Sequence, residues 1–251
     1  MAFGLCSKFQ NSSFKRAILL LFSRSNIRNI PAQVWRRYSS VVKDDSSVCK
    51  VLYLNSSGSD NRSYTGQTAR EFLAKYTQIY PEHLIEEINL WDENLLSFGL
   101  SHVESKMRIA SGQNLPEDKL KLLVVKEMTS QLLAANKVII SCPMWNYSIP
   151  YVLKQYIDCV VQSDLTFYDT ANGPEGLVTG RPLLLITSSS SDFSNEPMKS
   201  LDFQVPYLKA IFGFIGFRDF YHIYIGNTRH FRREELISFA RKRIQEEVHK
   251  F

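Results

Sequence analysis

The most restrictive feature of the sequence is a regular alternation of short apolar runs with longer amphipathic segments. Apolar runs occupy residues 48–55, 137–143, 181–189 and 219–226, and a weaker run occupies residues 84–91. Their length and their Val, Ile and Leu content are typical of buried parallel strands. The intervening segments predict helices. The sequence therefore predicts an α/β fold, a three-layer doubly wound five-stranded parallel sheet with the strand order 2-1-3-4-5.

Helical periodicity is clearest in the segments that follow the predicted strands. Ala69, Phe72 and Tyr76 lie three or four residues apart and predict the buried side of the first helix. Further helices are predicted at residues 116–136, from Pro150 onward, at about 203–212 and at 230–250. Residues 95–115 show no clear pattern. No repeat or linker divides residues 44–251, which are predicted to form one domain.

The first 43 residues differ in charge from the rest of the chain. They carry eight basic residues and no acidic one, so that residues 44–251 have a formal charge of −3 although the whole chain has +5. This distribution argues against a nucleic-acid-binding face on the folded domain, and we expect no nucleic-acid partner. The basic, Ser-rich and acid-free composition of residues 1–43 is typical of a mitochondrial transit peptide, and residues 36–40 resemble a processing site.

Two alternatives bear on the location of the protein. The N-terminal segment could remain attached as a disordered basic arm, and the protein would then be cytoplasmic. The apolar run at residues 17–22 is only six residues long, whereas a membrane span needs about 20, so we expect no membrane span. The four cysteines lack metal-ligand spacing, and we expect no metal site. Cys49, Cys142 and Cys159 are predicted to be small buried residues.

The loop after the first strand is a candidate phosphate site. In doubly wound folds, ligands bind beyond the carboxyl ends of the strands, where the strand order reverses. Residues 55–65 run into a helix N-terminus, whose free N–H groups favour an anion, and Ser57, Ser63 and Thr65 add hydroxyls. The loop has neither the Gly-Lys-Ser/Thr ending of a nucleoside triphosphate site nor a GxGxxG motif, so a monophosphate fits better. The alternative is a Ser-rich turn with a helix N-cap.

The loops after the third and fourth predicted strands offer groups suited to a planar ligand. Met144, Trp145, Asn146 and Tyr147 combine apolar and aromatic surface with an amide that both donates and accepts hydrogen bonds. The alternative is a core aromatic pair beside a turn-forming Asn. In the fourth loop, Ser188, Ser189, Ser190 and Ser191 precede Asp192. These serines could bind the other edge of a ring or form an ordinary polar connection.

Three longer stretches resemble the FMN-dependent NADH azoreductase family, flavodoxin-like enzymes that also reduce quinones. They are PMWNYSIPYVLKQYIDCVV at 143–161, TFYDTANGPEGLVTGRPLLLITS at 166–188 and FGFIGF at 212–217. The resemblance covers about residues 47–251 and implies a flavodoxin-like FMN-binding domain. By this resemblance, Ser57, Ser63, Tyr64 and Thr65 hold the phosphate, Met144, Trp145, Asn146 and Tyr147 line the isoalloxazine, and Ser188, Ser189, Ser190 and Ser191 take the remaining flavin edge.

The same resemblance implies a reaction and an assembly. Hydride would pass from NADH, or from NADPH, to FMN and then to a quinone or an azo compound, with ping-pong kinetics and no catalytic acid or base from the protein. The chain would form a homodimer in which Phe167, Tyr168 and Phe193 cover the neighbour's flavin, and Arg108 could contribute to the substrate pocket. The family commonly has Ser-Arg-Gly-Gly at residues 188–191, where this chain has four serines.

Two other functions fit the same scaffold. A flavodoxin-like FMN electron carrier would bind the flavin, lack an NADH site and stabilise a one-electron semiquinone. A flavin-free interaction protein would use the fold for binding alone, and the four-serine loop is the feature that favours it. Bleaching of flavin absorption by NADH separates the enzyme from both alternatives.

Overall fold

The computed structural model describes residues 48–58, 62–91, 99–113 and 115–251. The predicted presequence, residues 1–43, therefore lies outside the described residues. Within residues 44–251, the described part forms two compact units. One unit contains α4 (Leu100–Ala110) and most of α5 (Pro116–Ala134), and the other contains the sheet and the remaining elements.

The main sheet confirms the predicted topology. Its strands are β1 (Lys50–Asn55), β2 (Leu84–Asn89), β3 (Lys137–Pro143), β6 (Pro182–Ser188) and β7 (Asp219–Ile225). They lie in the order β2-β1-β3-β6-β7, and every neighbouring pair is parallel, which is the predicted 2-1-3-4-5 order. The inner strands β1, β3 and β6 are almost wholly buried, whereas the edge strand β2 is largely exposed. This explains why the β2 sequence is a weaker apolar run than the others.

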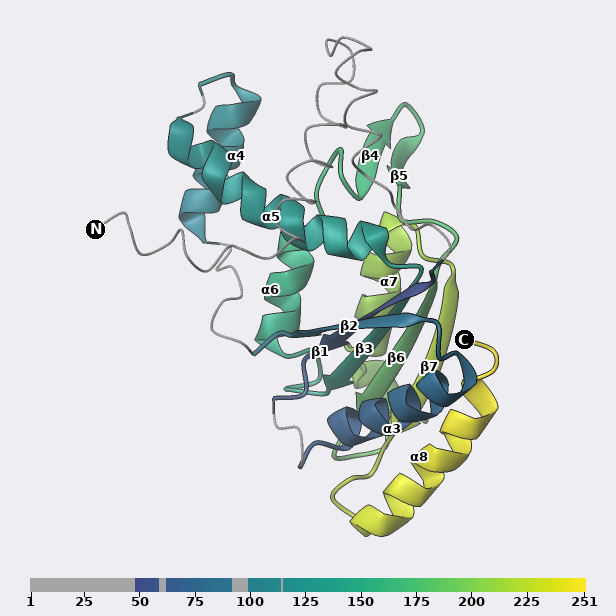
Figure 1. The fold of residues 1–251 in the computed structure, drawn as a ribbon. Helices are drawn as coiled ribbons and strands as arrows, with labels where there is room; N and C mark the ends of the chain where they lie inside the picture. Colours follow the sequence, from purple (N-terminus) through teal and green to yellow (C-terminus); the bar gives the residue numbers. More distant parts are fainter. Residues whose placement is uncertain (1–47, 59–61, 92–98, 114) are drawn as a thin grey trace, which may run out of the picture. The chain divides into compact units, whose positions relative to one another are not determined.

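Helices cover both faces of this sheet and produce the three predicted layers (Figure 1). On one face lie α3 (Tyr64–Ile79) and α8 (Arg233–Glu247), and on the other lie α6 (Tyr151–Val160) and α7 (Val205–Ile215). The core under α3 and α8 is built from alternate strand residues and from the apolar stripes of the two helices. Its members are Val51, Tyr53, Ala69, Phe72, Tyr76, Ile139, Leu184, Ile186, Ile223, Ile225, Leu236, Ala240, Ile244, Val248 and Phe251.

Two short strands were absent from the sequence-based prediction. β4 (Phe167–Thr170) and β5 (Gly173–Gly176) form an antiparallel hairpin of their own. Neither strand has the apolar run or alternation that would reveal it. The hairpin packs closely against the end of α7, because a Cβ atom on Gly176 would lie only 2.2 Å from the backbone carbon of Ile215. A 3-10 turn, η1 (Met198–Leu201), precedes α7, which extends to Ile215 rather than to the predicted residue 212.

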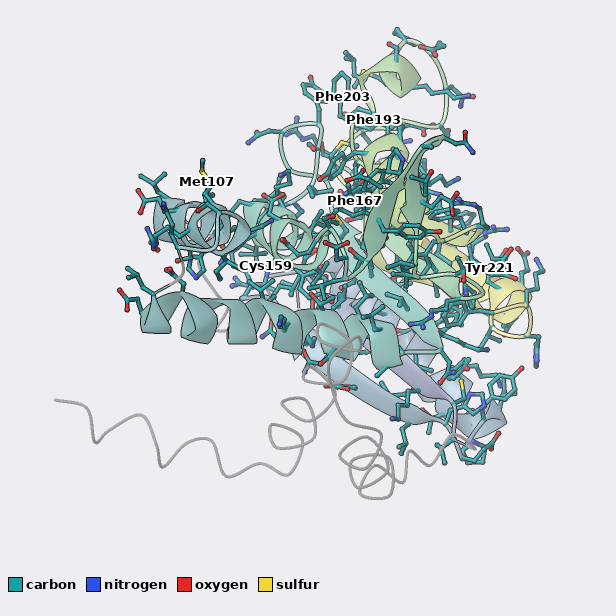
Figure 2. All side chains as sticks on the ribbon, turned by 90° about the horizontal axis from the view of Figure 1, so that it is seen from above. Met107, Cys159, Phe167, Phe193, Phe203 and Tyr221 are labelled. Atoms are coloured by element: carbon teal, nitrogen blue, oxygen red, sulfur yellow. The ribbon has the colours of Figure 1, made fainter. Side chains whose placement is uncertain are left out.

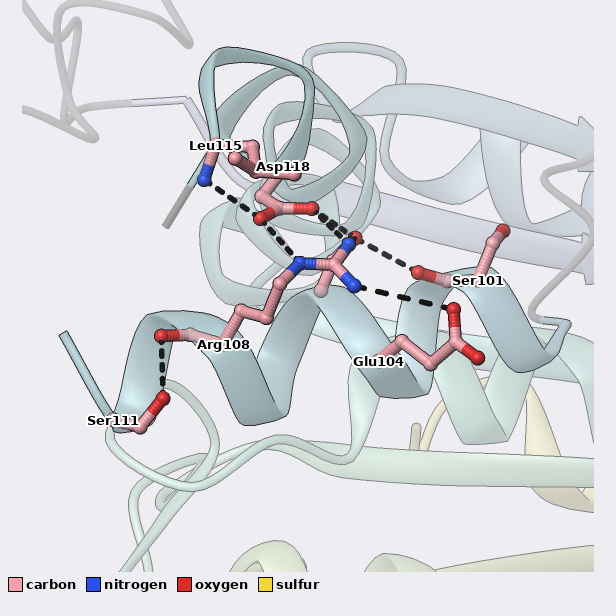
Figure 3. A network of polar contacts seen from close by, with 7 residues as sticks. Ser101, Glu104, Arg108, Ser111, Leu115 and Asp118 are labelled. Carbon is pink, nitrogen blue, oxygen red and sulfur yellow. Dashed lines mark hydrogen bonds and ion pairs between the residues drawn. The ribbon is translucent and has the colours of Figure 1, made fainter. Parts of the chain in front are cut away.

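The α4 and α5 unit is held by one buried carboxylate (Figure 3). Asp118 is fully buried and accepts hydrogen bonds from Arg108 Nε at 2.9 Å, Arg108 Nη2 at 2.6 Å and Ser105 Oγ at 2.6 Å. The Arg108 and Ser105 donors hold the pKa of Asp118 well below its ordinary value. The guanidinium of Arg108, which the resemblance suggested for the substrate pocket, is thus engaged by Asp118.

None of the helices in the described ranges combines the length and apolar character needed to cross a bilayer.

Candidate functional site

The three candidate loops meet at the carboxyl edge of the sheet, as predicted. Asn55 at the end of β1 lies opposite Ser141 of β3, and Pro143 at the end of β3 lies opposite Ser188 of β6. Backbone hydrogen bonds continue past the strand ends, from Met144 N to Ser188 O at 2.7 Å. Residues far apart in the sequence therefore lie side by side at this edge of the sheet.

A network of buried hydroxyls lies beneath the first loop. Ser57 Oγ is 2.9 Å from Thr65 Oγ1 and donates to Ser141 Oγ at 2.8 Å. Ser141 Oγ is also 2.9 Å from Tyr53 OH, and Thr65 Oγ1 is 3.0 Å from Ser63 Oγ. Ser57, Thr65 and Ser141 are buried, and their hydroxyls are hydrogen-bonded to one another, as buried polar groups generally are. The network fixes the loop relative to the start of α3.

The start of α3 has the features of an anion site. Ser63 is the N-cap, accepting from Gly66 N through Oγ at 3.2 Å and from Gln67 N through its carbonyl at 3.1 Å. The first turn carries no acidic residue. The remaining N–H groups of the turn have no intrahelical partner by geometry, and they are the donors a phosphate would use. The N-cap alternative thus also holds, because Ser63 caps the helix that supplies those donors.

Glycine permits the close approach of the loop to the helix. A Cβ atom on Gly66 would lie 3.3 Å from Ser57 Cβ and 3.6 Å from Arg70 Nη1. A larger residue would push the loop away from the helix start. The same distances place the Arg70 guanidinium beside the first turn, where a positive charge complements an anion.

Arg233, which the sequence analysis did not select, also reaches this turn. Its guanidinium carbon lies 4.6 Å from the centre of the Tyr64 ring, and it donates to Arg62 O at 2.9 Å and to Gln67 Oε1 at 2.7 Å. The sequence feature that could have identified Arg233 is its place at the first position of a predicted helix, α8, where the helix dipole disfavours a cation.

The second loop is a tight turn that displays aromatic side chains. Trp145 and Ser148 exchange two backbone hydrogen bonds of 2.9 Å, and Asn146 and Tyr147 between them have φ angles of 48° and 67°. Two consecutive positive φ angles are those of a type I′ turn. Trp145 is 42% exposed and Tyr147 is 48% exposed, which excludes the alternative of a core aromatic pair. Met144, which precedes them, is half-buried.

A second aromatic cluster, missed in the sequence, connects the first two loops. Trp91 follows β2, and its ring centre lies 5.3 Å from that of Trp145 and 5.5 Å from that of Tyr151. A Cβ atom on Gly58 would meet the Trp91 ring at 3.2 Å. The position of Trp91 at the end of a predicted strand was the signal that could have identified it.

Tyr147 is held from the far side by the segment before α7. Its carbonyl accepts from Phe203 N at 3.0 Å, and its ring centre lies 5.9 Å from that of Phe193, in an edge-to-face arrangement. Figure 2 labels both phenylalanines. Phe193 is 7% exposed and Phe203 is 56% exposed. Phe193, suggested as a cover for a neighbour's flavin, therefore packs within its own chain.

The four serines differ from one another in environment. Ser188 and Ser189 are buried, Ser191 is half-buried and Ser190 is exposed. Tyr224 OH anchors the loop, because it lies 2.6 Å from Ser189 Oγ, accepts from Phe193 N at 2.8 Å and donates to Ser191 O at 3.2 Å. None of the four serines has a positive φ. The loop therefore needs none of the conformational freedom that glycines at 190 and 191 would provide.

Cys142 lies beneath the aromatic loop as a buried thiol, as predicted. Burial raises the pKa of its thiol to about 12, and Gln204 Nε2 donates to its carbonyl at 3.0 Å. A thiol of this kind is protonated at neutral pH and unreactive. Cys159 is also buried, whereas Cys49 is half-buried and not buried as predicted, and all three are free. No group of side chains in the described ranges has the composition of a metal site.

A separate surface hollow lies at the other end of β7. It has a volume of about 400 Å³ and is lined by Pro174, Glu175, Gly176, Gly213, Phe214 and Arg218. Arg218 precedes β7, whereas the three loops follow the strand ends. The hollow therefore does not belong to the candidate site.

Comparisons with known proteins agree with this geometry. A family model described as a flavodoxin-like fold matches residues 49–248. An FMN-dependent NADH:quinone oxidoreductase of Nitratidesulfovibrio vulgaris is 31% identical over 201 residues, covering 76% of this chain and 96% of that protein. An FMN-dependent NADH:quinone oxidoreductase 1 of Bradyrhizobium diazoefficiens is 37% identical over 185 residues, covering 72% and 88%.

A solved structure extends the likeness to three dimensions. The crystal structure of an FMN-dependent NADH-azoreductase from Bacillus anthracis in complex with FMN has a TM-score of 0.76 and 26% identity, covering 81% of this chain and 99% of that one. The chain belongs to the flavodoxin-like family that includes the FMN-dependent NADH:quinone oxidoreductases and azoreductases.

Proposed function

We propose that the protein is an FMN-dependent NAD(P)H oxidoreductase that reduces quinones and azo compounds. The observation that carries the proposal is the meeting of a capped, acid-free helix start with an exposed aromatic turn at one sheet edge. The names of its relatives support NADH as the donor and a quinone as the acceptor.

The residues present fit FMN. Ser57, Ser63, Tyr64 and Thr65 would hold the phosphate, because the linked hydroxyls of Ser57, Ser63 and Thr65 and the amides of the first turn lie beside the close glycine contact at Gly66. Trp145 and Tyr147 would cover the ring, and Asn146 would hydrogen-bond to its edge. Met144 and the serines Ser188, Ser189, Ser190 and Ser191 would complete the lining.

The protein contributes binding and orientation to the reaction. FMN, when bound, supplies the chemistry of accepting and donating a hydride. We expect the nicotinamide donor and the acceptor to bind against the same flavin ring in succession, which gives ping-pong kinetics. We assign no catalytic acid or base and expect the protons of the reduced product to come from solvent.

The exposed aromatic surface supports a homodimer. Trp145, Tyr147 and Tyr168 are each more than a third exposed. A second copy of the chain would cover such groups and complete the active site. Light scattering of the purified protein tests this, with a mass of twice 29.0 kDa expected for the full chain. We also propose that the basic segment of residues 1–43 directs the protein to mitochondria, where cleavage near Tyr38 removes most of it. N-terminal sequencing of the mature protein should find a start near Tyr38.

The decisive experiment is the visible spectrum of the full chain before and after NADH is added without an acceptor. Flavin absorption that bleaches with NADH and returns with menadione is expected. A bound flavin that NADH does not reduce, with a stable semiquinone on chemical reduction, would favour an electron carrier. A chain that stays colourless after incubation with FMN would favour a flavin-free interaction protein.

Asn146→Gly provides a matched variant for this experiment. Glycine adopts the φ of 48° without strain, so the change removes the amide and leaves the turn intact. We expect FMN affinity to fall roughly fivefold to tenfold, the loss of about one hydrogen bond. Unchanged flavin stoichiometry and affinity in this variant would contradict the assignment of Asn146.

A further inference from the structure

Arg233 occupies a position that its own helix disfavours. It is the first residue of α8, where a positive charge opposes the helix dipole. Glu234 and Glu235 in the same turn have the sign that the dipole favours. Contacts outside α8 must therefore offset the unfavourable placement of Arg233.

Three such contacts lie at the entrance to α3. The guanidinium stacks on the Tyr64 ring at 4.6 Å, and its two terminal nitrogens donate to the Arg62 carbonyl and to the Gln67 side chain, at 2.9 and 2.7 Å. Stacking and two directed hydrogen bonds use the planar fork of arginine, which lysine does not have. Arg233 therefore fixes the chain where it enters the first turn of α3.

We propose that Arg233 selects the flavin by its phosphate. This inference rests on the proposed FMN site and adds to it a residue from a distant helix. By holding the Arg62 carbonyl, Arg233 orients the entrance to α3 so that the first-turn amides face the ligand. Its positive charge beside that turn also favours a phosphate, which carries a charge of about −1.5 to −2 at neutral pH, over an uncharged group. Arg233 is a positioning residue.

The same pair of helices offers a matched control. Arg241 also extends from α8 to α3, donating to both carboxylate oxygens of Glu71 at 2.8 and 3.0 Å. Glu71 lies seven residues after Tyr64, about 10 Å further along the helix. Arg241→Gln therefore removes an equal charge and a comparable tether between the two helices, away from the first turn of α3.

The test compares the affinities of the full chain for FMN and for riboflavin, which lacks the phosphate. Flavin fluorescence titrations are made on the wild type and on Arg233→Gln, Arg233→Lys and Arg241→Gln, at low and high salt. We expect Arg233→Gln to weaken FMN binding about tenfold while riboflavin binding changes less than about twofold. Arg233→Lys should recover part of the preference for FMN. High salt should reduce the difference between wild type and Arg233→Gln, because salt screens exposed charges.

Several results would overturn the inference. If Arg233→Gln lost equal affinity for FMN and for riboflavin, the role of Arg233 would be structural only. The same conclusion would follow if Arg241→Gln reduced the preference for FMN as much as Arg233→Gln does. If Arg233→Lys preferred FMN no more than Arg233→Gln does, the positive charge of Arg233 would not contribute to the preference, which contradicts the inference. A wild type that binds neither flavin would refute the proposed function as well. A wild type that prefers FMN, with an Arg233→Gln variant that keeps that preference, would refute this inference alone.

Discussion

The phosphate loop (residues 55–58 and 62–65) and the aromatic loop (residues 144–148) lie at the ends of neighbouring strands, yet they are stabilised differently. In the phosphate loop, buried hydroxyls bond to one another and to the strand beneath, through Ser57 and Ser141. In the aromatic loop, Trp145 and Tyr147 are largely exposed on a turn with two positive φ angles. The phosphate loop is therefore part of the core and forms the buried half of the site. The aromatic loop is exposed on the surface and forms the displayed half. Changes in the buried hydroxyls of the phosphate loop should therefore affect stability as well as binding, and changes in the aromatic loop should affect binding with little effect on stability.

The largest effect is expected at the centre of the hydroxyl network. Ser141→Ala leaves Tyr53 OH and Ser57 Oγ without a shared partner in a buried site. The free energy of unfolding should fall by about 1–3 kcal/mol, measured by urea denaturation. Ser190→Ala removes an exposed hydroxyl of the same site and should change it by less than about 0.5 kcal/mol. Equal effects of the two substitutions would show that the buried hydroxyl network contributes no more to stability than an exposed hydroxyl does.

Tyr224→Phe shows to which half the four-serine loop belongs. The substitution removes the hydroxyl that contacts Ser189, Ser191 and Phe193 and leaves the ring in place. We expect a loss of about 1–2 kcal/mol in unfolding free energy, because buried polar groups lose a partner. Tyr221→Phe on the same strand is the control and should cost less than about 0.5 kcal/mol. A negligible loss at Tyr224 would group the serine loop with the displayed half.

Tyr147→Gly tests the displayed half directly. Glycine relieves a left-handed conformation that costs a side-chain-bearing residue about 1–2 kcal/mol, and this gain offsets the lost ring contact with Phe193. Stability should therefore change by less than about 1 kcal/mol, while FMN affinity falls roughly threefold to tenfold. Tyr147→Phe keeps the ring and should retain affinity. A destabilisation as large as that of Ser141→Ala would show that the aromatic loop is also part of the core.

The smallest effect is expected at Cys142, under the aromatic loop. Its pKa is raised by burial from 9.0 to about 12, so the thiol form contributes stability below pH 9 that is lost as the pH rises toward 12. At pH 8 iodoacetamide should leave Cys142 unmodified in the folded protein and modify it after denaturation, as read by peptide mass spectrometry. The half-buried Cys49 should react faster. Modification of Cys142 in the folded chain would show that the buried region under the aromatic loop opens to solvent.

Much of the site could be predicted because its signals are local. The apolar runs ending at Asn55, Pro143 and Ser188 identify three strands, and parallel strands place their carboxyl ends at one edge. The resemblance to a known family then connected the three loops with FMN. Residues 95–115 gave no signal because α4 is short and its helical face depends on partners such as Asp118, which lies beyond it in the sequence.

The sequence by itself determined the five parallel strands and the positions of the three loops, since both follow from the period and length of apolar segments, and the doubly wound class of fold supplied the strand order. Only the tertiary structure decided which residues complete the site. Arg233 lies 171 residues from the Arg62 carbonyl that it holds, and Trp91 contacts Trp145 from another loop. Likewise, the hydroxyls of Ser57 and Ser141, 84 residues apart, are paired through the register of β1 and β3. Contacts of this kind arise from packing between elements, and no pattern within one segment records them.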